Sequence, residues 1–233
     1  MFDAIAPRYD LLNRVLSAGI DRRWRARAIR SLRLTERDRL LDVCSGTADV
    51  ALEARRSSAT RRVVGVDFAA AMLAYGMAKI RRFGEEGHVT LLRGDATQLP
   101  VQDRSVDAVT VAFGIRNVER PEAACVEMAR VLRPGGRLAI LEFGVPRVPG
   151  ISTLYLWYFK YLLPRVGRSV SGHSAAYSYL PASVSAFPPP EQFCAMLRAS
   201  GFEHVSAVPL TLGIVYLYTA SIPSDAPEAP LTP

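Results

Sequence analysis

Short apolar runs rich in β-branched residues alternate with longer stretches of helical periodicity from residue 39 onward. Repeated strand–helix–strand units of this kind build a parallel sheet with helices on its faces. We therefore expect an α/β fold. The expected strands are Leu40–Cys44, Val63–Asp67, Val89–Arg93, Val106–Ala112 and Leu138–Phe143, and the expected helices are Ala48–Arg56, Ala70–Phe83 and Pro121–Leu132.

Proline and glycine mark both ends of the third expected helix. Pro121 stands near its start, where a missing backbone N–H costs nothing, and Pro134-Gly135-Gly136 follows its end. Proline prevents continuation of a helix, and glycine permits the left-handed turn that closes it. The sequence thus predicts that this helix stops just before Pro134.

Two more expected strands near the end of the chain, Val205–Leu210 and Ile214–Ala220, are separated by only three residues, 211–213. A crossover helix needs a dozen or more residues, so these two strands must pair antiparallel. The sequence thus predicts a mostly parallel sheet that ends in an antiparallel hairpin.

The 233 residues suffice for one full hydrophobic core, whereas two domains would each be small. We expect a single domain over residues 1–220, with a helical cover at about 1–34 and an insertion at about 145–190 that also covers a substrate. Both segments are rich in aromatic residues. Residues 221–233 alternate proline with small or acidic residues, which predicts a disordered tail.

The chain carries a formal charge of +7, and arginine supplies nearly all of the positive charge. Such a balance suits nucleic acid, an anionic membrane surface or an acidic ligand, but also an ordinary solvated surface. The densest cluster is expected on a helix that also carries two apolar residues and could therefore lie at a membrane interface. This cluster consists of Arg22, Arg23, Arg25, Arg27 and Arg30, with Trp24 and Ile29 between them.

The three cysteines, Cys44, Cys125 and Cys194, are widely separated and have no metal-ligand spacing to a histidine. We expect neither a disulfide framework nor a metal site. The first residues lack the basic and apolar parts of a signal peptide, and the apolar stretch Ile151–Leu163 is too short to span a bilayer. We expect a cytoplasmic protein with peripheral contact at the inner face of the membrane.

A candidate ligand loop runs from Asp42 to Asp49, where the first expected strand turns into a helix. In open α/β sheets, ligands bind at this carboxyl edge. Gly46 allows close approach of the backbone, and the amide groups that open the helix suit a carboxylate such as that of methionine. A tight turn without a ligand would have the same sequence.

Two further sites are expected at the same edge. Asp67 ends the second strand and could accept both hydroxyls of an adenosine ribose, although a lone aspartate there is often a helix cap. Asp95 follows the third strand and could bind the adenine amino group, while Ala96 leaves room for the ring. Together the three sites favour an adenosine cofactor.

A nicotinamide-dependent dehydrogenase would also place an acid at the second strand. The loop has a single glycine, Gly46, where a pyrophosphate would need G-x-G-x-x-G. The dehydrogenase interpretation is therefore disfavoured.

Four stretches of the chain resemble the ubiquinone/menaquinone biosynthesis C-methyltransferases, and together they span about residues 2–220. The first and fourth are specific to that family, whereas the glycine loop and the Arg-Pro-Gly-Gly turn occur in many methyltransferases. The stretches are Phe2–Ala6 with Tyr9–Ser17 and Trp24, Phe113–Val118, Arg130–Gly136 with Glu142, and Ala176–Pro181 with Phe187-Pro188.

The resemblance implies a class I, Rossmann-like methyltransferase that moves a methyl group from S-adenosylmethionine to a ring carbon of demethylmenaquinol or a similar prenylated benzoquinol. This chain departs from the family at three positions. Ala48 stands where the family usually has a second loop glycine, Ala112 where some members have a serine, and Gly144 where a serine is common. If position 48 needs a positive φ, alanine costs on the order of 1 kcal/mol. The expected cofactor residues are Asp42, Gly46, Thr47, Asp67, Asp95, Ala96 and Ala112.

Methylation of a quinol carbon is easier once a ring hydroxyl has lost its proton. Arg116 lies just past the fourth expected strand, and its permanent positive charge could stabilise the phenolate, while Asn117 orients the ring oxygen. This pair could instead tie its loop to the sheet edge. Tyr177 is a third catalytic candidate, and Tyr9 and His173 could also move a proton or pack the ring.

Aromatic residues at 155–161 would suit an isoprenoid tail. The expected partners are a prenylated quinol, the membrane surface and a second copy of the chain, with no nucleic acid. A methyltransferase for RNA or another small molecule and a non-catalytic S-adenosylmethionine binder remain alternatives, but no RNA-binding module is added to the fold. The choice between naphthoquinol and benzoquinol stays open.

Overall fold

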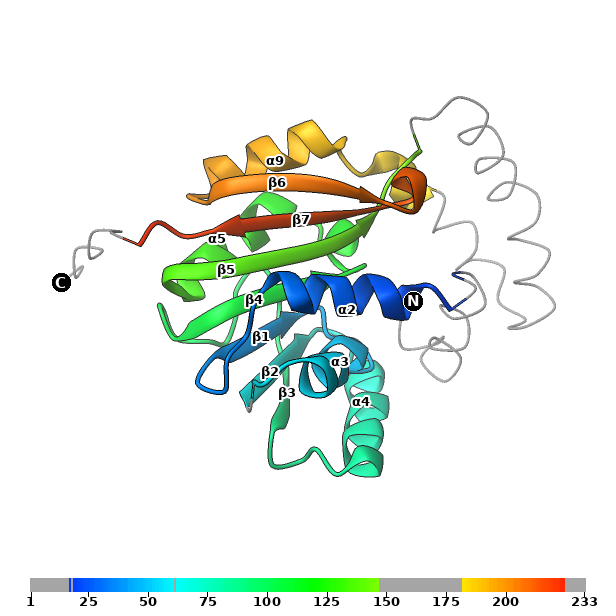
Figure 1. Cartoon of the computed structure of the whole chain (residues 1–233), viewed down its shortest axis with the longest axis vertical. Coiled ribbons are helices and arrows are strands. Elements are labelled where there is room, and N and C mark those ends of the chain that lie inside the picture. Colours follow the sequence, from blue (N-terminus) through cyan, green and yellow to red (C-terminus); the bar gives the residue numbers. More distant parts are fainter. Residues whose placement is uncertain (1–16, 18, 61, 147–181, 225–233) are drawn as a thin grey trace.

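The computed structural model describes residues 17, 19–60, 62–146 and 182–224 (Figure 1). Seven strands of this part form one sheet in the order β3-β2-β1-β4-β5-β7-β6. They are β1 (Arg39–Val43), β2 (Arg62–Asp67), β3 (Val89–Arg93), β4 (Val106–Ala112), β5 (Leu132–Phe143), β6 (Glu203–Leu210) and β7 (Val215–Ser221).

The sheet is mostly parallel. Strand β1 pairs in parallel with β2 and β4, and the outer pairs β2–β3 and β4–β5 are also parallel. Strand β7 runs antiparallel to both of its neighbours, β5 and β6. A single short turn, η3 (Thr211–Gly213), joins β6 to β7, which confirms the expected terminal hairpin.

Helices cover both faces of the sheet (Figure 1). On one face, α2 (Asp21–Ser31), α3 (Asp49–Ser57) and α4 (Ala70–Phe83) pack over one apolar cluster. On the other, α5 (Pro121–Val131) and α9 (Pro190–Ala199) pack over a second cluster. Neighbouring residues of β1 divide between the two clusters, since Leu40 belongs to the first and Leu41 to the second.

Two details differ from the sequence-based expectation. Helix α5 ends at Val131, and β5 begins at once with Leu132, so the expected turn at Pro134-Gly135-Gly136 lies within the strand. The register between β4 and β5 shifts there, because Val106 faces Leu132 but Ala108 faces Arg137. The extra residues form a bulge. Helix α9 was not predicted, because its short apolar pattern follows a proline run.

The two apolar residues of the basic cluster do not lie at a surface. Trp24 is 6% exposed and Ile29 is fully buried, and both pack in the core beneath α2. The expectation that they form part of an interfacial surface is therefore wrong, and α2 presents only its other face to solvent.

Several expected features lie outside the described residues: half of the N-terminal cover, most of the insertion, Tyr9, His173, Tyr177 and the aromatic run at 155–161. Within the described ranges, no helix is long and apolar enough to cross a membrane. The same ranges hold no group of three or more potential metal ligands.

Gly65 in the middle of β2 should not tolerate a side chain. A Cβ there would lie 2.5 Å from Leu91 Cδ2 and 2.9 Å from Ser45 Oγ. We expect Gly65→Ala to lower the free energy of unfolding by about 1–3 kcal/mol through overpacking. Urea denaturation measures this change.

Gly87→Ala is the matched control, because a Cβ at Gly87 would meet nothing within 4 Å. We expect it to change the free energy of unfolding by less than about 0.5 kcal/mol. Equal stability of the two variants would contradict the tight packing between β2 and β3.

Candidate active site

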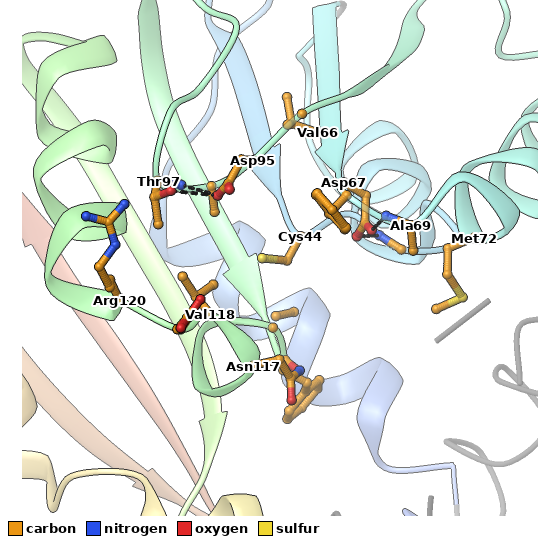
Figure 2. Close-up of a pocket in the computed structure, with 18 residues that line it drawn as sticks. Cys44, Val66, Asp67, Ala69, Met72, Asp95, Thr97, Asn117, Val118 and Arg120 are labelled. Atoms are coloured by element: carbon orange, nitrogen blue, oxygen red, sulfur yellow. Dashed lines mark hydrogen bonds between the residues drawn. The ribbon is translucent and has the colours of Figure 1, made fainter. Parts of the chain in front are cut away.

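A cavity of about 380 Å³ opens at the carboxyl ends of β1, β2 and β4, beside the turn that follows β3 (Figure 2). The strand order reverses between β1 and β4, and this switch point is where open α/β sheets bind ligands. The volume of the cavity suits a small-molecule or cofactor site. The expected site residues that line it are Gly46, Asp67, Asp95, Ala96, Ala112 and Asn117.

Asp67 joins the ends of β1 and β2. Its Oδ2 accepts a hydrogen bond from Gly46 N at 2.8 Å, and its Oδ1 accepts one from Ala69 N at 2.8 Å. Ser45 N also donates to Val66 O at 3.1 Å. The carboxylate therefore fixes the glycine loop, and its oxygens lie in the wall of the cavity, where a carboxylate oxygen can accept more than one hydrogen bond.

The backbone after β1 turns sharply. Cys44, Gly46 and Ala48 have φ values of 57°, 53° and 65°. Position 48 does have a positive φ, so alanine there carries a strain of about 1 kcal/mol. Ala48 is fully buried, and burial of its methyl contributes roughly 0.8 kcal/mol in the opposite direction. The two effects nearly cancel, so we expect little weakening of the loop.

Asp95 stays charged at the cavity wall. Its Oδ1 accepts hydrogen bonds from both N and Oγ1 of Thr97, each at 2.8 Å. These bonds lower the pKa of Asp95 below its ordinary value. The adjacent Ala96 lines the same wall with a small side chain.

Asp42 lies deeper, and it does not line the cavity. It is 1% exposed, and neither carboxyl oxygen has a hydrogen-bond partner among the described residues. Burial, aided by the negative charge of Asp67, raises the pKa of Asp42 well above its ordinary value. Thr110, its neighbour in register on β4, has a buried hydroxyl that likewise lacks a partner in the described part of the chain.

Thr47 does not line the cavity. Its Oγ1 accepts a hydrogen bond from Lys79 Nζ at 3.1 Å, and Lys79 also pairs with Asp49. Asp49 pairs in turn with Arg25 at 2.9 Å, and Arg25 with Asp21 at 2.7 Å. This network connects α2, α3 and α4 around the glycine loop.

The segment after β4 is held in a strained conformation. Phe113 has a φ of 60° although it is not glycine. Its carbonyl oxygen accepts hydrogen bonds from Arg116 Nη1 at 2.7 Å and from Asn117 Nδ2 at 3.3 Å. The Phe113 ring packs on Phe143 with centroids 4.6 Å apart.

Glu142 at the end of β5 anchors this segment. It is fully buried, and its Oε1 lies 2.6 Å from Arg116 Nη1 and accepts a hydrogen bond from Phe143 N at 2.8 Å. Arg116 is itself 8% exposed at its side chain and does not line the cavity. Asn117, one residue on, does line it.

Reasoning from the sequence missed the apolar wall of the cavity. Phe68 is 70% exposed and lines it beside Met72 and Cys44. The sequence did contain a signal for Phe68. It directly follows Asp67, which ends β2, so its ring lies beyond the strand and has no core position to fill. Arg120, which also lines the cavity, was not predicted, because it lies two residues beyond the Phe113–Val118 motif that contains Arg116.

The strand order, the antiparallel β7 and the cavity at the switch point define a class I, Rossmann-like methyltransferase fold. A solved S-adenosylmethionine-dependent methyltransferase from Aquifex aeolicus has the same fold, with a TM-score of 0.57 at 18% identity over 85% of this chain and 89% of that one. At this identity the likeness concerns the fold alone.

Residues 1–221 match the ubiE/COQ5 methyltransferase family, and the chain belongs to that family. It is 48% identical to the ubiquinone/menaquinone biosynthesis C-methyltransferase UbiE of Syntrophotalea carbinolica, over 97% of this chain and 94% of that protein. It is 46% identical to the demethylmenaquinone methyltransferase of Thermus thermophilus, over 96% of this chain and 100% of that protein. The resemblance seen in the sequence is confirmed.

The Arg116–Glu142 pair should be needed for stability. Arg116→Met leaves Glu142 buried without its cation, and we expect the free energy of unfolding to fall by about 3–5 kcal/mol. The double variant Arg116→Met/Glu142→Leu removes both charges and should regain most of that loss. Urea denaturation of Arg116→Met, Glu142→Leu and the double variant gives the coupling free energy between the two side chains.

The control is Asp103→Asn, which removes an ion pair of Arg130 in which Asp103 is 68% exposed. We expect a change below about 1 kcal/mol there. If Arg116→Met were no more destabilising than this control, the pair would not anchor the segment.

Proposed function

We propose that this chain transfers the methyl group of S-adenosylmethionine to a ring carbon of demethylmenaquinol and so forms menaquinol. Its match over 100% of the length of a demethylmenaquinone methyltransferase is the observation that carries the proposal. Ubiquinol precursors, which are prenylated benzoquinols, are second substrates of the same class.

The residues of the cavity fit the cofactor. Asp67 and Asp95 both line the cavity, and carboxylates of this kind accept hydrogen bonds from ribose hydroxyls and from an adenine amino group. Ala96 leaves space for the adenine ring, and the exposed Phe68 offers it an apolar surface. Gly46 and Ala112 border the remaining part.

The buried Asp42 and Thr47 take a less direct part. The unpartnered oxygens of Asp42 lie beneath the glycine loop and can accept a bond from water that reaches the amino group of the cofactor. Thr47 holds the loop through Lys79. We propose that both residues shape the site more than they touch the cofactor.

S-adenosylmethionine supplies an electrophilic methyl group on a sulfonium. The chain must then hold the quinol ring in line with that methyl group and favour loss of the proton from the ring hydroxyl. Asn117 lines the cavity and orients the ring oxygen. Arg116 is neutralised by Glu142 and acts as a positioning residue that fixes Asn117, in place of the stabilisation of the phenolate expected from the sequence.

The chemistry of the proposed substrate also bears on the location of the protein in the cell. A prenylated quinol has a long apolar tail, so we propose peripheral contact with the inner face of the membrane and closure of the site by the two covering segments, with Tyr177 against the ring. Assembly into a homo-oligomer is a further proposal.

Methyl transfer tests the reaction directly. Labelled S-adenosylmethionine is incubated with demethylmenaquinol, and separately with its benzoquinol counterpart, in detergent under reducing conditions. We expect label on the ring of the naphthoquinol and slower labelling of the benzoquinol. Cofactor binding without transfer to either quinol would refute the proposal.

Asp67→Asn tests the cofactor site. An amide cannot accept hydrogen bonds at both of its positions, so it loses contacts both to the loop and to the ribose. We expect the dissociation constant for S-adenosylmethionine to rise about 10- to 100-fold, as for loss of one bond to a charged group. Calorimetry measures this constant.

Asp107→Asn is the matched control. Asp107 also accepts two bonds, from Arg39 N at 2.8 Å and from Arg133 Nη1 at 2.8 Å, but at the start of β4. It should leave cofactor affinity unchanged. If both variants lost affinity for S-adenosylmethionine equally, the loss would reflect lower stability of the fold and not a contact between Asp67 and the cofactor.

A further inference from the structure

Helix α2 presents four arginines to solvent. Arg22, Arg23, Arg27 and Arg30, here called the arginine row, are all exposed, while Ala28 and its apolar neighbours pack on the sheet. Their spacing places them on one side of the helix. Within the described residues, no acidic side chain pairs with any of the four.

Positive charge is concentrated on the face of the sheet that α2 covers. Helices α2, α3 and α4 together carry ten basic and three acidic residues. Helices α5 and α9 on the opposite face carry two basic and three acidic residues. The helices on the α2 side of the sheet therefore carry the larger excess of positive charge, although Arg25, Arg55, Arg56 and Lys79 are paired with carboxylates.

An exposed apolar tip stands beside this row. Leu212 in η3 is 62% exposed and has a left-handed φ of 60°. The neighbouring Thr211 Oγ1 accepts a hydrogen bond from Trp24 Nε1 at 2.9 Å, which ties the tip to the N-terminal half of α2. Figure 1 shows η3 at the same end of the molecule as the start of α2. The apolar tip and the start of the basic helix thus lie at one end of the molecule, and interfacial surfaces combine groups of these two kinds.

We propose that the arginine row docks on the surface of an anionic lipid bilayer, with Leu212 entering the headgroup region. This inference rests on the proposed function, because a prenylated quinol partitions into the bilayer and the enzyme must meet it there. The row attracts acidic headgroups, and the apolar tip favours insertion. Docking on this face brings the N-terminal side of α2 to the membrane.

Nucleic acid is the other polyanion that could bind a basic face. Binding of unpaired bases needs aromatic platforms between the cations. The aromatic residue of α2, Trp24, is buried, and the exposed side of the helix offers arginine, alanine and serine. The surface therefore fits a lipid headgroup layer better than RNA.

Vesicle binding tests the proposal. The full chain is centrifuged with vesicles of phosphatidylcholine alone and with vesicles that also contain phosphatidylglycerol. We expect binding to the second kind only, weakened by added salt. Arg23→Gln/Arg27→Gln should lower the partition coefficient about 30-fold, since each basic residue near an anionic surface contributes about fivefold.

The matched control is Arg104→Gln/Arg198→Gln, which removes the same charge but away from α2, with Arg198 on α9 of the opposite face. We expect a far smaller loss of binding. Equal losses in the two variants, or no binding to the acidic vesicles, would overturn the proposal. So would a labelled oligoribonucleotide that binds more tightly than the vesicles and displaces the chain from them.

Enzyme assays separate this inference from the proposed function. Arg23→Gln/Arg27→Gln should retain methyl transfer to a short-tailed quinol in detergent but lose it towards a long-tailed quinol embedded in acidic vesicles. Failure of the wild-type chain to methylate any quinol would refute the proposed reaction, whatever the vesicle result. Full activity of the variant on vesicle-embedded quinol would refute docking through the arginine row.

Discussion

The carboxylate of Asp67 holds together the edge of the sheet on which the site is built. It accepts one backbone hydrogen bond from Gly46 after β1 and one from Ala69 before α4, each at 2.8 Å. These bonds connect two crossover units at the switch point of the sheet. Because a carboxylate oxygen accepts more than one bond, the same group can hold the loop and bind a ligand. Structural and ligand-binding roles therefore coincide in one side chain.

The sequence predicted the strands, their direction and six of the residues that line the cavity, because parallel strands bring every residue that follows them to one edge. It could not predict that Asp42 and Thr47 do not line the cavity. Asp42 is buried within β1, and Thr47 lies between left-handed residues at 46 and 48, of which the alanine gives no sign of such a conformation in the sequence. The buried partnership of Arg116 with Glu142 was also hidden, since 26 residues separate the two in the chain.

Charge burial distinguishes the arginines that support the fold from those available to partners. Arg25 and Arg116 are each 8% exposed at the side chain and pair with carboxylates of Asp49 and Glu142. Removing one member of such a pair leaves an uncompensated buried charge, which is the costly case. The exposed arginines of α2 have no such partner among the described residues, so their replacement costs the fold little. Arginine content alone carries no information about this division.

Helix α2 combines both kinds of arginine on opposite sides. Through Arg25 its buried side reaches Asp49, which opens α3 directly after the glycine loop, and Lys79 joins the same carboxylate from α4. Its exposed side carries the arginine row. A force applied to α2 by a membrane surface would therefore act on the element that borders the cofactor loop, through contacts of less than 3 Å between Arg25 and its carboxylates. The same ion pairs connect the start of α3 to both α2 and α4, so the membrane-facing side of α2 and the loop before α3 belong to one connected unit.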